Sequence, residues 1–148
     1  MVAKGAGGQD HKVFAPRRTK AVALTLATTV AFLTLVTIVL PPTGFAVWDR
    51  AAMVVLAAPI VWFLWRQSSV RAVPSAQGLH VRNLIKERQL EWAEIVHVRF
   101  GDRPWVQLDL DDGDTIAVMG IQRSDGERAV AESRRLATLV ERHSRPQQ

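Results

Sequence analysis

The stretch WVQLDLDDGDTIAVMG, residues 105–120, decides the fold class of the second half of the chain. Apolar and polar residues alternate on both sides of the turn residues DDGD, as they do in two strands with one buried face. A three-residue loop, 111–113, pairs Leu108 with Ile116 and buries both side chains, whereas a two-residue loop would turn Ile116 towards solvent. Because burial sets strand register, we predict the three-residue loop, with Gly113 in the left-handed region.

A similar alternation extends upstream of this hairpin. A short strand is predicted over residues 70–73, and an alternating segment follows in GLHVRN. Paired strands are then expected through LIKERQLEW, residues 84–92, although its glutamates would also suit a short helix, which stays an alternative. In EIVHVRF, residues 94–100, the alternation predicts that Val96 and Val98 share one apolar face.

After Gly120 the hydrophobic period changes to that of a helix. Ser124 followed by Glu127 has the spacing of a capping box, which predicts a helix from there to about His143. Its inward face is expected to contain Ala129, Val130, Ser133, Leu136, Ala137 and Val140. The opposite, solvent-exposed face is expected to contain Arg128, Glu132, Arg135 and Arg142.

The first half of the chain holds two apolar runs. AVALTLATTVAFLTLVTIVL, residues 21–40, contains no charge, Pro or Gly, and as a helix it would span the hydrocarbon core of about 30 Å. AAMVVLAAPIVWFLW, residues 51–65, reaches a similar length when residues 47–50 are added. We predict a transmembrane helical hairpin, 21–40 and 47–65. The alternatives are a signal peptide, whose apolar region is normally shorter, and a re-entrant second segment.

The net charge of +5 is concentrated before the first apolar run. Residues 1–20 carry +4, residues 21–65 carry one charge of each sign, and residues 66–148 carry thirteen basic and twelve acidic side chains. Because basic residues flank the outer ends of the two runs, we expect a multi-pass protein of the inner (plasma) membrane with both termini in the cytoplasm. The balanced charge of the second half argues against a nucleic-acid partner.

These features divide the chain into five parts. They are a basic N-terminal tail (1–20), the helical hairpin (21–65), a linker with a possible first strand (66–77), a small mainly β domain (78–143) and a C-terminal tail (144–148).

The mainly β part resembles a known family. GLHVRN, RQLEWAEIVHVRF and the hairpin pattern W-x-x-L-x-L-x-D-G resemble the bacterial pleckstrin-homology (PH) domain, and L-x-W-x-E-I, beginning at Leu90, is the most specific element. With the two-helix stem, the chain resembles actinobacterial membrane proteins of the low-molecular-weight protein antigen 6 type. The resemblance covers about residues 66–142. It implies a small α+β, PH-like fold, a bent antiparallel sheet or split barrel capped by the C-terminal helix. Trp92 follows Leu90 at an inward position of the alternation, which predicts that Trp92 lies in the core.

No pattern for catalysis, cofactor binding or metal binding is present in the sequence. The absence of cysteine excludes disulfides and thiolate sites, and no G-x-S-x-G motif occurs. The aspartates near Gly113 suggest a calcium loop, but an EF-hand alignment would place Leu108 at position one and Met119 at position twelve. We expect turn solvation instead, and solvent-exposed positions for His80 and His97. The sequence predicts a protein that is not an enzyme and has no cofactor.

Two sets of residues are candidates for contact with partners. Many eukaryotic PH domains bind inositol phosphates through a basic loop, so the resemblance implies lipid-headgroup contact at Arg82, Lys86 and Arg88. Arg103 and Trp105 form a candidate protein-interaction surface, unless Trp105 folds over the barrel mouth. We predict a membrane protein that presents its domain to an unidentified membrane or cytoplasmic protein, as an accessory subunit of a membrane complex. The alternative is a module that senses anionic lipid headgroups.

Overall fold

The computed structural model of the protein describes residues 11–144 and divides into two compact units. One unit contains Thr19–Ser69. The other unit combines the segment that precedes these residues, up to Arg18, with the chain from Val70 onwards. Most of the two expected tails, residues 1–10 and 145–148, lies outside the described residues.

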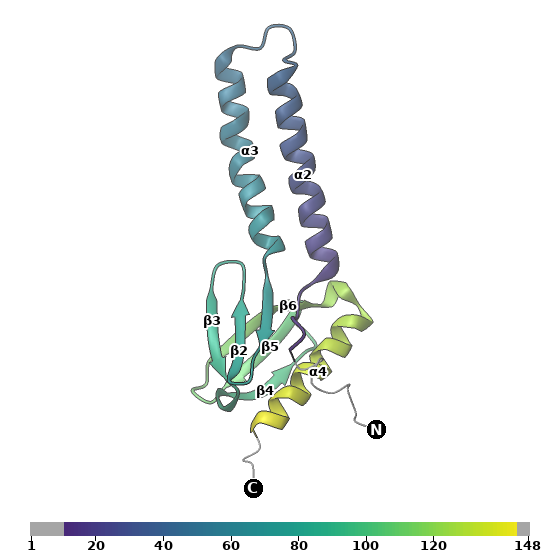
Figure 1. Cartoon of the computed structure of the whole chain (residues 1–148), viewed down its shortest axis with the longest axis vertical. Helices are drawn as coiled ribbons and strands as arrows, with labels where there is room; N and C mark the ends of the chain where they lie inside the picture. Colours follow the sequence, from purple (N-terminus) through teal and green to yellow (C-terminus); the bar gives the residue numbers. More distant parts are fainter. Residues whose placement is uncertain (1–10, 145–148) are drawn as a thin grey trace, which may run out of the picture. The chain divides into compact units, whose positions relative to one another are not determined.

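The first unit is built from two helices, α2 (Arg17–Val39) and α3 (Val47–Ser68), shown in Figure 1. Both are long and apolar enough to cross a membrane. They extend beyond the expected spans, 21–40 and 47–65, at the ends next to the second unit. The reason is that a span prediction counts only residues suited to hydrocarbon, whereas a helix continues into polar residues as long as its backbone is hydrogen-bonded.

Apolar side chains are exposed on several faces of both helices. Phe32 is 63% exposed, and Val55 and Leu56 are 71% and 67% exposed. Four threonine hydroxyls of α2 donate to carbonyls one turn earlier, as from Thr28 to Leu24 at 2.7 Å, which satisfies these hydroxyls on the apolar surface; the four are Thr28, Thr29, Thr34 and Thr37. Such helices lack the single polar face of a surface helix in a soluble protein.

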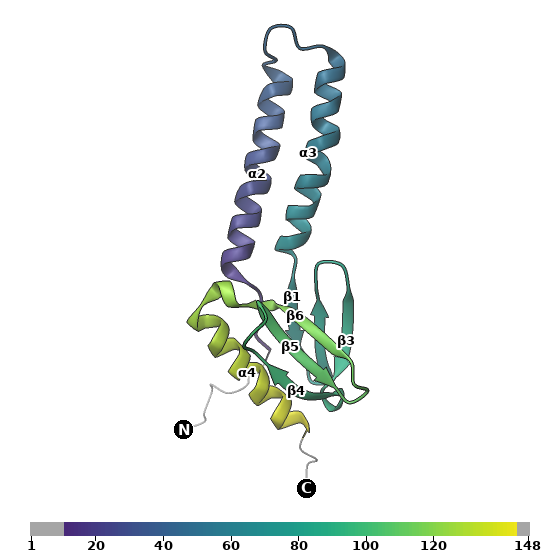
Figure 2. The same ribbon diagram turned by 180° about the vertical axis from the view of Figure 1, so that it is seen from behind.

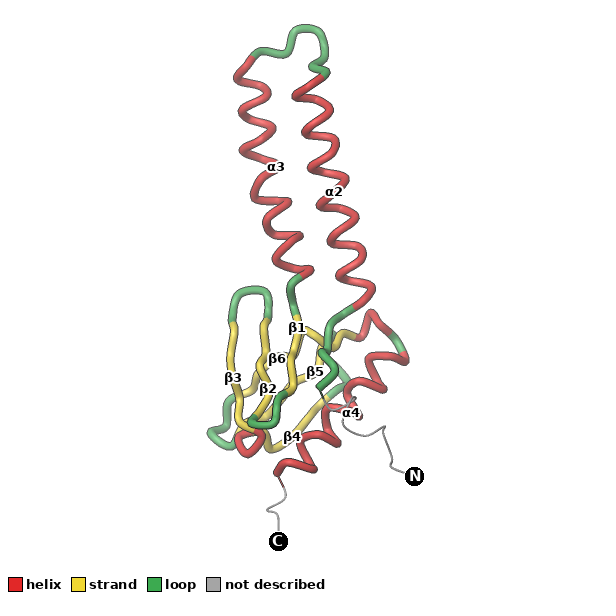
Figure 3. The backbone as a smooth tube through the Cα atoms, in the orientation of Figure 1, coloured by secondary structure: helices red, strands yellow, loops and turns green. Residues whose placement is uncertain are grey.

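The second unit contains two antiparallel three-stranded sheets, seen as yellow segments in Figure 3. The first sheet contains β1 (Arg71–Pro74), β2 (Gly78–Arg82) and β3 (Glu87–Glu91), in that order. The second contains β4 (Ile95–Arg99), β5 (Trp105–Leu110) and β6 (Thr115–Gln122), also in chain order. β1 and β3 overlap the strands expected over residues 70–73 and 84–92, but residues 84–86 lie in the turn before β3.

The hairpin β5–β6 has the predicted register. Leu108 pairs with Ile116 and Val106 pairs with Val118. Gly113 has a φ of 86°, and its amide donates to the carbonyl of Leu110 at 3.1 Å. The three-residue loop is therefore confirmed, because only this loop keeps the apolar side chains of both strands on one face.

The junction between β3 and β4 departs from the predicted alternation. Residues Trp92–Glu94 form one turn of 3-10 helix, so the helical alternative for this region was right over three residues only. The strand pairing of β4 is then irregular between Ile95 and His97. This bulge turns Val96 outwards, where it is 50% exposed, so the prediction that Val96 shares the buried face was wrong.

The C-terminal helix α4 (Glu127–Ser144) starts later than the capping-box pattern predicted. Ser124 lies instead in a 3-10 turn, Arg123–Asp125, and Gly126 follows it with a φ of 61°, a conformation that glycine adopts without strain. The buried face of α4 differs from the predicted one. Leu139, which the prediction omitted, is buried, whereas Val130, which it included, is 39% exposed.

The core of this unit lies between the two sheets and α4, which packs against β4 and β6 (Figure 2). Its fully buried side chains include Leu79, Leu90, Val106, Leu108, Val118, Leu136 and Leu139. Trp92 is 4% exposed, as expected, and its indole N–H donates to the carbonyl of Ser75 at 2.9 Å. The apolar helix pair followed by a mainly β unit with a C-terminal helix confirms the predicted fold class.

Candidate functional site

The segment before α2 is an integral part of the β unit. We call residues 12–16 the N-terminal strap. Phe14 is 1% exposed, and its backbone exchanges two hydrogen bonds of 2.8 Å with Ala72 of β1. The strap crosses β6 at Gly120, where a Cβ would lie 2.7 Å from the carbonyl oxygen of Phe14. Glycine is therefore needed at this crossing, because any side chain would displace the strap.

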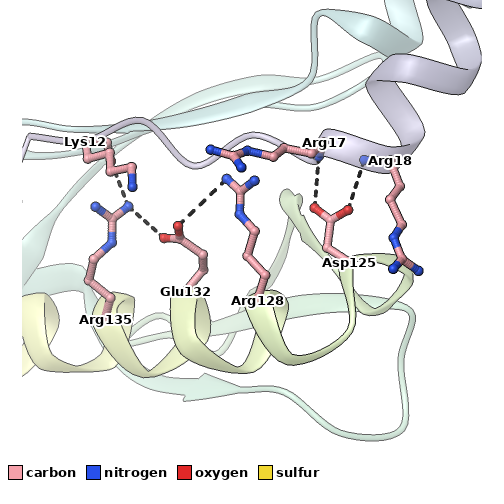
Figure 4. A network of polar contacts seen from close by, with 7 residues as sticks. All are labelled: Lys12, Arg17, Arg18, Asp125, Arg128, Glu132 and Arg135. Carbon is pink, nitrogen blue, oxygen red and sulfur yellow. Dashed lines mark hydrogen bonds and ion pairs between the residues drawn. The ribbon is translucent and has the colours of Figure 1, made fainter.

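Helix α4 holds the strap from the other side, as Figure 4 shows. The guanidinium of Arg135 lies 3.9 Å from the centre of the Phe14 ring and donates to the carbonyl of Lys12 at 2.8 Å. Glu132 orients Arg135 through an ion pair of 2.9 Å. The prediction that Arg135 and Glu132 face solvent was therefore wrong, since this face of α4 is covered by residues that come from before the helical unit.

The carboxylate of Asp125 caps the start of α2, directly after the strap. Its two carboxylate oxygens accept hydrogen bonds from the backbone amides of Arg17 and Arg18, at 2.9 and 3.0 Å. The first amides of a helix lack partners within the helix, and its dipole favours a negative charge there. The 3-10 turn that displaced the start of α4 thus has a role, because it positions this carboxylate.

Residues 11–18, which the sequence analysis included in a basic N-terminal tail, belong to the same compact unit as the sheets. Positive charge dominates the composition of this segment, and the apolar residues Val13, Phe14 and Pro16 are too few to show a strand or helix period. The only local signal was an aromatic residue, Phe14, shortly before an apolar helix. The partners of Phe14 lie more than fifty residues away in sequence.

A second candidate site surrounds the β4–β5 loop. A cavity of about 560 Å³ is lined there by Arg99, Phe100, Gly101, Asp102, Arg103, Trp105, Gln107 and Thr115. Trp105 is half-buried while Arg103 is exposed, so the structure brings the two predicted interaction residues together at one open cavity. An aromatic ring beside guanidinium groups is a common composition for the centre of a protein-binding surface.

One carboxylate at the edge of this cavity is already paired. Arg99 donates to the carboxylate of Asp109, which also accepts a hydrogen bond from the Thr115 hydroxyl at 3.1 Å. The hydrogen bond from Arg99 lowers the pKa of Asp109 below its ordinary value, against a smaller opposing effect of desolvation.

The predicted lipid-contact residues are divided by the sheet. Lys86 and Arg88 line a cavity of about 540 Å³ next to the β2–β3 turn, where Arg88 lies 3.5 Å from Asp114. Arg82 is not among its lining residues, and it pairs across the strands with Glu87. Because neighbouring positions of a strand point to opposite faces, Arg82 projects away from the face that carries Arg88, which pairs with Val81.

The remaining polar candidates take part in local contacts. In the turn after β5, Asp112 accepts a hydrogen bond from the amide of Asp114 at 2.9 Å. His80 is exposed and forms an ion pair of 2.9 Å with Glu87, and His97 is exposed as well. Between residues 11 and 144, no three His, Asp or Glu side chains converge in a way that could hold a metal ion.

Comparison with known proteins supports the fold. The family model described as "Bacterial PH domain" matches residues 69–138. The uncharacterized proteins Rv1417 of Mycobacterium tuberculosis (strain H37Rv) and Mb1452 of Mycobacterium bovis are 36% identical to the chain over 104 residues, covering 67% of this chain and 65% of each relative. The match thus spans slightly less than two thirds of these relatives. No solved structure matches the chain significantly.

The matched residues begin just before β1 and end within α4, so they cover both sheets and most of the helix that packs on them. The match and the architecture agree: residues 69–138 form a domain of the bacterial PH family, and the N-terminal strap packs against it.

Proposed function

We propose that this protein is an integral membrane protein in which α2 and α3 span the cytoplasmic membrane and the PH domain binds another protein on the cytoplasmic side. The observation that carries the proposal is the exposed apolar surface of both helices, illustrated by Phe32, Val55 and Leu56. Exposing contiguous apolar surface of this extent to water is unfavourable, whereas hydrocarbon accommodates it.

The distribution of basic residues supports the orientation. Lys12, Arg17 and Arg18 precede or begin α2, and Arg66 and Arg71 lie at or beyond the end of α3. The loop between the helices offers no basic residue, and Arg50 in the first turn of α3 follows Asp49, whose carboxylate caps that helix. An excess of Lys and Arg marks cytoplasmic segments, so both termini and the PH domain are assigned to the cytoplasm.

The cavity at the β4–β5 loop supports a role in protein binding. Trp105 provides apolar contact area with little conformational entropy to lose, and Arg103 can donate several hydrogen bonds to a partner's carboxylate or carbonyl groups. This combination suits docking better than catalysis, which needs a nucleophile or a proton donor aligned with a base. We therefore assign the protein a non-catalytic role, as the accessory subunit of a membrane complex.

Site-specific photocrosslinking in the native membrane tests this proposal. A photoreactive amino acid at Arg103 should yield a crosslinked product of one defined mass, because a docked partner would cover this loop. The same probe at Glu141, an exposed position on α4, is the matched control. A product that forms equally from both positions, or monomer alone from Arg103 under every growth condition, would contradict the proposed binding surface.

A further inference from the structure

The two sheets of the PH unit have four edge strands, β1, β3, β4 and β6, and three of these edges are covered or irregular. The strap bonds to the outer edge of β1 at Ala72, and the side chain of Asn83 bonds to the backbone of β6. The pairing of β4 is interrupted between Ile95 and His97. β3 differs, because it pairs regularly with β2 over all five residues and no other strand or helix lies beyond it in Figure 1 or Figure 2.

The hydrogen bonds at the two ends of β3 show which of its backbone groups point outwards. The amide of Asn83 donates to the carbonyl of Lys86 at 2.9 Å, so these two positions bond across the turn. In an antiparallel pair, positions that bond to the partner strand alternate with positions that point away from it. The backbone groups of Glu87, Gln89 and Glu91 therefore point away from β2. The amide of Glu91 agrees with this direction, because it donates to the carboxylate of Glu94 at 2.7 Å.

The outward groups of Glu87 and Gln89 have no backbone partner. Within residues 11–144, no hydrogen bond joins the backbone of either residue to another strand or to a loop. A row of unpaired amides and carbonyls on a strand edge is a template to which an extended chain can add as a further strand. In such complexes the main-chain hydrogen bonds provide affinity and the side chains of alternate positions provide specificity.

The charges around this edge favour a basic partner. Residues 86–94 and 111–114 carry six carboxylates and two cations, in a chain whose net charge is +5. The two segments form one surface, since the amide of Asp111 donates to the carbonyl of Glu94 at 2.9 Å. An extended chain with basic side chains would therefore meet opposite charges along β3, and opposite charges on neighbouring strands stabilise their pairing.

The same charges disfavour pairing of β3 with β3 of a second copy. The side chains of Glu87, Gln89 and Glu91 share one face of the strand, and all three are exposed. In an antiparallel self-pairing centred on Gln89, each Glu87 would face a Glu91. Like charges at opposed positions are destabilising, and charged side chains protect edge strands against self-association. The edge thus disfavours its own copy and stays open to a chain of opposite charge.

We propose that the outer edge of β3 binds an extended, basic segment of another protein, which adds as a fourth strand to the sheet of β1, β2 and β3. Basic side chains of this segment face Glu87 and Glu91. Its intervening residues are apolar, because the opposite face of β3 carries Arg88, which lines the cavity of about 540 Å³ together with apolar side chains such as Ile116. This surface is separate from the β4–β5 loop and does not depend on the proposed membrane span.

Binding of a synthetic peptide to the full chain in a neutral detergent tests the inference. The probe is fluorescein-labelled Ser-Lys-Val-Thr-Val-Lys-Ser, whose lysines have the spacing of Glu87 and Glu91. Two further peptides are methylated on a single backbone nitrogen, one at threonine and one at the following valine. An added strand bonds through alternate amides, so we expect one of the two methyl groups to abolish binding and the other to be tolerated. Fluorescence anisotropy measures the affinities.

Variants at Gln89 test the same edge from the side of the protein. Gln89→Pro removes one outward amide, and an edge strand tolerates proline where the N–H faces away from its partner strand. Gln89→Ala changes the side chain alone and is the matched control. We expect Gln89→Pro to weaken binding at least about tenfold and Gln89→Ala to change it less than about twofold. A peptide with glutamate in place of both lysines should bind at least about tenfold more weakly.

Several results would overturn the inference. They are equal binding of the two methylated peptides, equal binding of the lysine and glutamate peptides, or no binding of the lysine peptide at about 1 mM. The methylated peptides are compared on the unaltered protein, so their result does not depend on whether Gln89→Pro folds. If sedimentation showed a dimer that Gln89→Pro converts to a monomer, the edge would serve a second copy, and the proposed basic partner would be wrong.

Discussion

The two segments that connect the PH domain to the helices are held by different means. After the helices, β1 forms hydrogen bonds to β2 along four residues. Before the helices, the strap makes one bridge to Ala72 and depends on the side chains of Phe14, Arg135 and Asp125. A strand shared over many backbone bonds tolerates substitution, whereas a segment held by three side chains does not. β1, which follows α3, is thus held in the domain by backbone hydrogen bonds. The strap, which precedes α2, is held there mainly by a few side chains.

Phe14→Ala tests this contrast with the largest expected effect. Removing a buried phenylalanine leaves a cavity and should lower the free energy of unfolding by about 3–5 kcal/mol. Denaturation of the full chain in detergent, followed by tryptophan fluorescence, measures it. The matched control is Val13→Ala, where the side chain is 41% exposed and the loss should stay within about 0.5 kcal/mol. Equal effects of the two substitutions would show that the strap contributes nothing specific to stability.

Asp125→Ala examines the junction of the strap with α2. Loss of a capping carboxylate costs about 0.5–2 kcal/mol, and the freed amides of Arg17 and Arg18 should exchange faster with solvent deuterium. Asp102→Ala removes the same charge from an exposed loop and should leave that exchange unchanged. If exchange at Arg17 and Arg18 were the same in both variants, the start of α2 would not depend on Asp125.

The ion pair of Arg99 and Asp109 lies on the second sheet, away from the strap, and breaking it should have the smallest effect on stability. Because the pKa of Asp109 is lowered in the folded protein, its contribution to stability is present above the unfolded pKa of about 3.9 and is lost as pH falls through the folded value. In Arg99→Gln the pKa of Asp109 should rise, which carboxyl chemical shifts in an NMR titration would report. An unchanged titration would mean that Arg99 does not lower this pKa.

Residues close together in the chain accounted for the parts of the fold that were predicted. The β5–β6 hairpin was predicted in register because its strands, turn and buried face all lie within sixteen residues. The outward turn of Val96 was missed because a bulge depends on the partner strand. That Arg103 and Trp105 line the same cavity could be predicted because they are close in sequence. That Arg82 and Arg88 point to opposite faces of the sheet could be known only from the strand register.

The sequence by itself determined two apolar spans, a mainly β domain of the PH type and a closing helix, since each follows from hydrophobic period and turn chemistry over neighbouring residues. Only the tertiary structure decided that Phe14 belongs to the core, that Asp125 caps α2 and that Arg135 is covered. These contacts join residues separated by more than fifty positions, and their energy comes from burial and hydrogen bonding that exist only once the sheets have formed. The pattern of neighbouring residues therefore cannot predict a contact with a residue that is distant in the chain.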